Sequence, residues 1–187
     1  MTCIVAISNP TTKEIIIGGD RAISDTLNGI TITSKHPKVF KWNSYLIGYA
    51  GDIRAGKVVQ YQFAPPEPNP DIDLDYFMNT EFISNLKSCF SDNEYEISKE
   101  DHSTGFGLIV AINGRIFEIT SQFEAIEYTT NYIAIGSASD YALGSLHTTE
   151  FIKNITMKQR VEYALTAAAE YSTTCSAPFD IIDIGEK

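Results

Sequence analysis

Apolar and polar positions along the first fifty residues follow the spacing of β-strands. Two short runs rich in β-formers flank the turn-forming stretch Asn9-Pro10-Thr11-Thr12, and the run at 29–34 alternates with a period of two. The run at 38–51 predicts a hairpin that turns at Asn43-Ser44. The predicted strands therefore lie within 2–8, 13–19, 29–34 and 38–51.

Helical spacing replaces this pattern after Gly51. Asp52 can cap a helix that continues to about Phe63, and the proline-rich stretch 64–70 ends it. Apolar residues then recur at helical intervals over 73–90. The polar stretch 91–103 predicts a loop.

The second half repeats the order of strands followed by helices. Asn113-Gly114 marks the turn of a predicted hairpin, and Pro178 opens the last predicted strand. The predicted elements are a hairpin over 105–120, further strands within 125–137, helices over 138–151 and 157–172, and a strand over 178–184.

Two β-rich blocks, each followed by a pair of helices, favour two packed sheets with helices outside both. We therefore expect an α+β fold of four layers, an αββα sandwich, in a single domain over 1–187. Periodicity alone also permits a simpler α+β fold.

Composition narrows the function classes. The net charge of −10 disfavours binding to nucleic acids and docking on anionic membranes, which both require a basic surface. No apolar run approaches the roughly 18 residues of a membrane span, and no signal peptide is recognisable. Three cysteines without C-x-x-C spacing argue against a disulfide framework and a zinc site, and fit a reducing cytoplasm.

Familiar catalytic signatures are absent from the sequence. It contains no G-x-S-x-G, no H-E-x-x-H and no P-loop. His36, His102 and His147 stand apart, with no cysteine or carboxylate at ligand spacing. Mechanisms that need a histidine are therefore disfavoured, whereas a mechanism that uses the chain's own α-amine stays open.

Thr2 carries the first candidate chemistry. If Met1 is removed, Thr2 holds a hydroxyl nucleophile and a free α-amine that can act as its base. A small polar residue at a chain end is the simpler interpretation, and Thr2 alone does not decide between the two.

Three further segments place candidate groups near strand ends. Asp20 follows two glycines after a strand, and Lys38 begins another strand. Gly48 and Gly51 lie at a strand-to-helix junction, where backbone N–H groups can face an anion. Taken singly, each has a structural explanation: a turn cap, a solvated charge or a bend.

Taken together, these residues resemble one family. The chain is similar to N-terminal-nucleophile (Ntn) hydrolases of the proteasome β-subunit type, and most similar to the bacterial HslV branch, whose members work with a ring ATPase. The similarity is strongest in the first 51 residues and weakest between Pro65 and His102. The stretches that carry it are TCIVAI, IIIGGDRAIS, PKVFKW, LIGYAGD, YIAIGSASDYALGSL and AAAEYSTTC.

The resemblance implies a role for each matched residue. Thr2 corresponds to the nucleophile, Asp20 to its acidic neighbour, and Lys38 to the buried lysine that pairs with that acid. Gly48 corresponds to the backbone donor of the oxyanion hole, and Ser137 to a serine near the terminal amine. The family requires no cofactor for its chemistry.

Strand register distinguishes Thr2 from Cys3 as the nucleophile. Relative to the family spacing, the chain has two extra residues before Asp20 and two more before Lys38. Even insertions preserve which face of a strand each side chain occupies, whereas a nucleophile at Cys3 would reverse that face. We therefore expect Cys3 to be a core residue.

The last helix departs from the proteasome pattern but fits the HslV branch. Ser172 and Cys175 stand where proteasome subunits have an aspartate and a serine. In the HslV branch, three backbone carbonyls in this region can bind a sodium ion, and they correspond to Ala169, Ser172 and Cys175. The residue types permit this structural ion without arguing for it.

The resemblance implies a cytoplasmic threonine endopeptidase that acts on unfolded proteins or peptides. It also implies a ring-shaped homo-oligomer, stacked in pairs and served by an AAA+ ATPase unfoldase. Side chains near Arg21, Lys38 and Tyr49 are expected to line its pocket. Two alternatives remain open: a catalytically silent assembly subunit that retains Met1, and a small-molecule amidase on the same fold.

Overall fold

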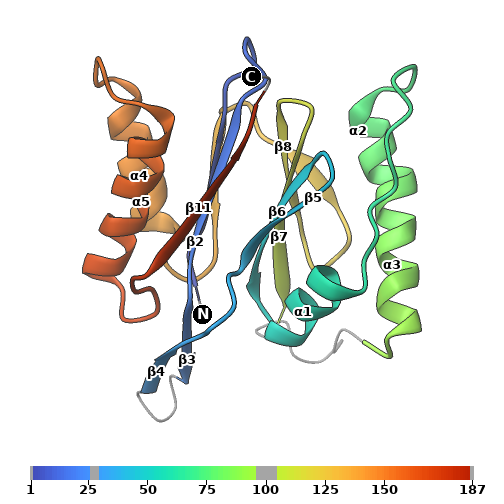
Figure 1. Cartoon of the computed structure of the whole chain (residues 1–187), viewed down its shortest axis with the longest axis horizontal. Helices are drawn as coiled ribbons and strands as arrows, with labels where there is room; N and C mark the ends of the chain where they lie inside the picture. The colour runs from blue at the N-terminus through green and yellow to red at the C-terminus, as the bar shows by residue number, and fades with distance from the viewer. Residues whose placement is uncertain (1, 26–29, 96–104, 186–187) are drawn as a thin grey trace.

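The computed structural model describes residues 2–25, 30–95 and 105–185. Two β-sheets face each other in the middle of the molecule, and helices cover the outer face of each (Figure 1). This arrangement confirms the predicted α+β class and the four-layer order of helix, sheet, sheet and helix. In the described residues, no helix has the length and apolar character needed to cross a membrane.

The first sheet has four antiparallel strands. In spatial order they are β10 (Tyr132–Ile135), β1 (Ile4–Ser8), β2 (Ile15–Asp20) and β11 (Phe179–Ile184). Every residue of β1 and β2 is buried. These two runs are apolar without strict alternation because layers pack against both of their faces.

The second sheet has five antiparallel strands and begins with the hairpin predicted at Asn43-Ser44. In spatial order they are β5 (Val39–Trp42), β6 (Tyr45–Gly51), β7 (Phe106–Ile112), β8 (Arg115–Ile119) and β9 (Ala125–Glu127). The hairpin at Asn113-Gly114 also forms, and both turn residues have positive φ, as a two-residue type I′ turn requires.

A separate two-stranded ribbon extends beyond the sandwich. It consists of β3 (Ala22–Asp25) and β4 (Ile30–Thr33), and Figure 1 shows it projecting past the ends of the sheets. β3 follows β2 after one residue, Arg21. Asp20 and Ala22 therefore both lie at the end of β2 where the ribbon leaves the first sheet.

The helices form the two outer layers (Figure 1). α4 (Ser139–Glu150) and α5 (Met157–Tyr171) cover the first sheet. On the other side lie α1 (Ile53–Tyr61), α2 (Leu74–Phe77), the π-helical turn η1 (Met78–Phe82) and α3 (Ile83–Asp92). Asp52 caps α1 as predicted, with its carboxylate accepting the Ala55 N–H.

Three apolar clusters fill the spaces between the four layers. One packs the first sheet against α4 and α5, one lies between the sheets, and one packs the second sheet against α1 and α3. The sequence predicted the helix over 73–90 without its π-helical turn, which periodicity at this length does not resolve. The predicted loop 91–103 lies mostly outside the described residues.

Two glycines provide a matched test of helix packing. A Cβ on Gly56 in α1 would lie 2.0 Å from the Tyr49 ring, whereas one on Gly144 in α4 would meet nothing within 4 Å. We expect Gly56→Ala to lower the free energy of unfolding by about 1–3 kcal/mol through overpacking. Gly144→Ala should raise it by about 0.5–1 kcal/mol, because alanine is the better helix former.

Urea unfolding of the two variants beside the wild type measures both effects. A neutral Gly56→Ala would show that the Tyr49 ring does not pack against α1 as described.

Candidate active site

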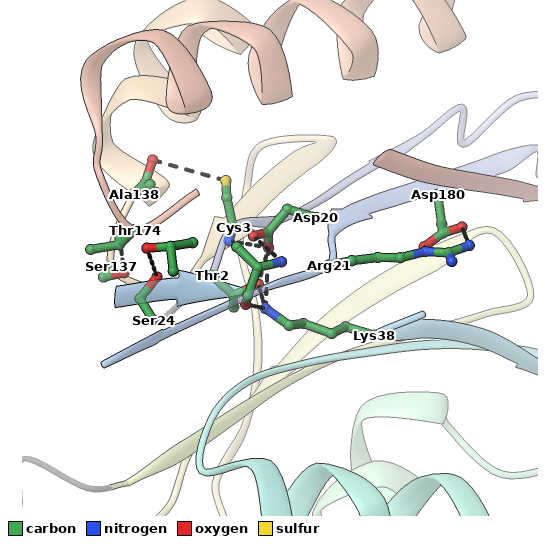
Figure 2. A network of polar contacts seen from close by, with 12 residues as sticks. Thr2, Cys3, Asp20, Arg21, Ser24, Lys38, Ser137, Ala138, Thr174 and Asp180 are labelled. Carbon is green, nitrogen blue, oxygen red and sulfur yellow. Dashed lines mark hydrogen bonds and ion pairs between the residues drawn. The ribbon is translucent and has the colours of Figure 1, made fainter. Parts of the chain in front are cut away.

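Thr2 lies two residues before β1, and only 2% of its surface is exposed. Its hydroxyl donates to Oδ1 of Asp20 and accepts from Nζ of Lys38, which is 2.6 Å away. These contacts place a hydroxyl between a carboxylate and an ammonium group, as Figure 2 shows. The structure therefore brings together three of the five predicted catalytic residues.

Asp20 is fully buried and is held by backbone N–H groups from two directions. Its Oδ1 accepts the Cys3 N–H at 3.0 Å, and its Oδ2 accepts the Ala22 N–H at 3.0 Å. The antiparallel register of β1 and β2 sets this geometry, since the Asp20 N–H in turn donates to the Cys3 carbonyl at 3.3 Å. The carboxylate is thus fixed before any substrate arrives.

Lys38 reaches the same place from the edge of the second sheet. Its Nζ lies 3.4 Å from Oδ1 of Asp20 and also donates to the Ala22 carbonyl, and the residue is 5% exposed. Burial lowers the pKa of the Lys38 ammonium, and the Asp20 carboxylate opposes that shift. A lysine in this state holds its proton less firmly than one in water.

The lowered pKa of Lys38 predicts how stability changes with pH. Between the folded pKa and the ordinary value of 10.5, the unfolded chain holds a proton that the folded chain lacks. Stability from this group therefore rises with pH through that window, and it is lost as the pH falls through the folded pKa. In Lys38→Met this titration is absent.

Urea unfolding of the wild type and Lys38→Met from pH 7 to about 10.5 tests this sign. The wild type should gain stability relative to the variant as the pH rises. A difference that stays constant or shrinks would contradict the burial of the ammonium.

A small pocket opens beside the Thr2 hydroxyl. Its volume of about 10 Å³ is close to the least space that holds one water molecule, and its walls come from the segment before β1, from β3, from β6 and the residue before β5, and from the start of α1. The lining residues are Thr2, Ala22, Lys38, Tyr49, Ala50, Gly51 and Ile53. Lys38 and Tyr49 therefore line the pocket as predicted, and Ile53 joins them without any signal in the sequence.

Gly48 lies inside β6, one residue before this pocket. Its register partners are Val39 on one side and Ile109 on the other, and a Cβ there would meet side chains of the layer between the sheets. The Tyr49 N–H donates to the Lys38 carbonyl at 3.1 Å, so strand alternation directs the Gly48 N–H toward β7. The oxyanion role of Gly48 stays a prediction, and the pocket-lining Gly51 is its alternative.

Ser137 belongs to a segment that packs against Thr2. The Ala138 N–H donates to the Thr2 carbonyl at 3.5 Å, and a Cβ on Gly136 would lie 2.3 Å from that carbonyl oxygen. The Ser137 hydroxyl lies 2.7 Å from that of Thr174, which lies 2.7 Å from that of Ser172. The predicted contact with the terminal amine stays a prediction, and the link to Thr174 is new.

The predicted sodium ligands lie where α5 ends. Ala169 is in its last turn and Ser172 follows it as the C-cap, while Cys175 is three residues farther along. Backbone carbonyl oxygens are a ligand type that suits a hard cation such as sodium. The Ser172 carbonyl also accepts the Cys175 N–H at 3.5 Å, and the ion itself stays a prediction.

Cys3 is fully buried in the cluster under α4 and α5, as strand register predicted. The neighbouring Cys175 thiol and burial raise the pKa of the Cys3 thiol. Because the thiolate is the nucleophilic form, this environment disfavours Cys3 as a nucleophile.

Arg21 corrects one expectation of the sequence analysis. It does not line the pocket, because its guanidinium turns to Asp180 of β11 and forms two hydrogen bonds of 2.7 and 2.5 Å. Figure 2 shows this pair beside the Thr2, Asp20 and Lys38 side chains and outside their contacts. Met1 and His102 lie outside the described residues. The removal of Met1 therefore stays a prediction.

Solved structures with a similar fold include BPH from Thiobacillus denitrificans. BPH in complex with epoxomicin gives a TM-score of 0.80 at 17% identity and covers 98% of each chain. BPH alone gives 0.78 at 18% identity over 99% of this chain and 98% of the other.

Two further proteins extend the comparison. Eukaryotic HslV from Trypanosoma brucei gives a TM-score of 0.70 at 16% identity over 99% of this chain and 100% of the other. Anbu, the ancestral β-subunit from Yersinia bercovieri, gives a TM-score of 0.69 at 16% identity over 98% of this chain and 81% of the other. No protein-family model and no curated protein matches by sequence. The chain therefore has the proteasome β-subunit fold of Ntn hydrolases, established by structure rather than by sequence identity.

Proposed function

We propose that this protein is a threonine peptidase whose nucleophile is Thr2 after removal of Met1. The observation that carries the proposal is the position of the Thr2 hydroxyl, between Asp20 and the buried ammonium of Lys38 and at the wall of a pocket. The fold shared with HslV and BPH agrees with this assignment.

The proposed reaction is hydrolysis of a peptide bond through an ester intermediate. Oγ1 of Thr2 attacks the substrate carbonyl while the α-amine takes the hydroxyl proton, and the resulting ammonium gives that proton to the leaving nitrogen. Water then attacks the ester with the amine again as base, which releases the carboxylic acid and restores Thr2. The ordinary pKa of an α-amine, about 7.7–8.0, leaves a neutral base available near pH 7.

Lys38 and Asp20 have distinct parts in this proposal. The Lys38 ammonium, 2.6 Å from Oγ1, favours the developing alkoxide by direct electrostatic attraction. Asp20 offsets the cost of burying that ammonium and fixes its position. A backbone donor from the segment at Gly48–Gly51 would stabilise the tetrahedral oxyanion, which is worth about 3 kcal/mol in other enzymes.

The assembly and its partners belong to the same proposal. We infer a ring-shaped homo-oligomer, stacked in pairs and fed unfolded chains by an AAA+ ATPase in the cytoplasm. Size-exclusion chromatography with light scattering measures whether the purified protein forms such a ring.

The test of function uses protein whose N-terminus has been confirmed as Thr2 by intact mass. We expect it to cleave an unfolded protein such as reduced, denatured casein and to yield peptides identifiable by mass spectrometry. A well-formed oligomer that cleaves nothing would contradict the proposal and favour an assembly subunit. Hydrolysis confined to small acyl-amides would favour an amidase.

A further inference from the structure

Arg21 connects three segments that meet at the candidate site. Its side chain forms the bidentate ion pair with Asp180 of β11, and its Nη1 donates to the Lys35 carbonyl at 3.0 Å. Its own carbonyl accepts the Ser34 N–H at 2.8 Å. One residue therefore joins the junction of β2 and β3, the start of β11, and the segment that leads to Lys38.

Two of the segments that Arg21 joins set the position of the Lys38 ammonium. The junction of β2 and β3 supplies two groups that contact Nζ of Lys38, the Asp20 carboxylate and the Ala22 carbonyl, and these residues flank Arg21 in the chain. Lys35 lies three residues before Lys38. Residues 34–38 are not part of a strand, and one sheet bond, from the Tyr49 N–H to the Lys38 carbonyl at 3.1 Å, holds the end of this segment at Lys38. The Arg21 contact with the Lys35 carbonyl adds a second point of attachment.

We propose that Arg21 is a positioning residue, which through Asp180 and the Lys35 carbonyl holds the Lys38 ammonium against the Thr2 hydroxyl. This inference rests on the proposed function. Arg21 lies outside the pocket lining, and its contacts are with Asp180 and backbone groups. It therefore acts through Lys38 rather than on a substrate.

The chemistry of the guanidinium suits this task. Its planar fork binds both carboxylate oxygens of Asp180 and still has an N–H for the Lys35 carbonyl, which the compact ammonium of a lysine cannot reproduce. The side chains of Arg21 and Asp180 are 29% and 19% exposed, so the pair should add little to global stability. An effect on rate without an effect on stability is its expected signature.

The test compares Arg21→Lys and Asp180→Asn with a matched control. Arg115 and Glu127 form a second bidentate pair, 32% and 33% exposed, between β8 and β9 and away from the pocket. We expect Arg21→Lys and Asp180→Asn to lower kcat about tenfold to 100-fold, because small displacements of reacting groups are costly. KM should stay within about threefold, and Arg115→Lys should leave both constants within about twofold.

Acetylation of Lys38 by acetic anhydride, mapped by mass spectrometry, provides a readout that does not depend on turnover. Arg21→Lys keeps the charge and removes the fork, so we expect its Lys38 to be acetylated about tenfold faster as the ammonium becomes exposed. Rates of acetylation and kcat equal to those of the wild type would overturn the proposal. An increase in KM alone would also overturn it, by placing Arg21 against the substrate. If the wild type hydrolyses nothing, the proposed function fails, and the acetylation rates still decide the role of Arg21.

Discussion

Thr2→Ala should abolish peptide hydrolysis, with a loss of at least about 1,000-fold in kcat/KM. The reason is that Oγ1 is the atom that the structure places between Asp20 and Lys38, and alanine removes it. The measurement is the rate of cleavage of an unfolded substrate by protein with a confirmed N-terminus.

Thr2→Ser is the matched control for that loss. Serine keeps the hydroxyl and removes only the methyl group, which packs near Gly136. We expect activity to fall by no more than about tenfold. The hydroxyl is kept, and the loss arises because the position of the nucleophile is less constrained without the methyl group. Equal activity in Thr2→Ala and the wild type would remove Thr2 from the mechanism.

Asp20→Asn should destabilise the fold by about 3 kcal/mol, because it removes the carboxylate that faces the buried Lys38 ammonium. Asp20 is fully buried and Lys38 is 5% exposed, so water cannot replace the lost partner. The measurement is urea unfolding at pH 7.

The double variant Asp20→Asn/Lys38→Met separates charge from packing in this prediction. Removal of the ammonium should recover most of the loss, because no unpaired charge remains. Glu127→Gln breaks an exposed pair and should cost only about 0–1 kcal/mol. If the double variant is as unstable as Asp20→Asn, the loss comes from the hydrogen bonds of Asp20 rather than from Lys38.

Much of the fold could be read from the sequence because its strands and caps have local signals. Asp52 begins α1, and Asn113-Gly114 turns the hairpin between β7 and β8, as residue type alone predicts. The π-helical turn and the short strand β3 have no such signal, because tertiary packing rather than local preference decides them.

The candidate site likewise contains residues that the sequence predicted and contacts that it missed. Thr2, Asp20 and Lys38 were predicted through the resemblance of their segments to the proteasome β-subunit family, and the structure brings the three side chains into contact. The Ala22 carbonyl was missed, because a backbone acceptor gives no signal in the sequence. The pairing of Arg21 with Asp180 joins residues 159 positions apart, which no single sequence reveals.

The most direct test of the central claim compares two preparations that differ only in Met1. One is released with Thr2 at its N-terminus from a cleavable fusion, and the other keeps Met1, with both masses confirmed. The account predicts that only the Thr2 form hydrolyses an unfolded peptide, because only that form has a free α-amine beside the hydroxyl. Equal hydrolysis by both forms would contradict it.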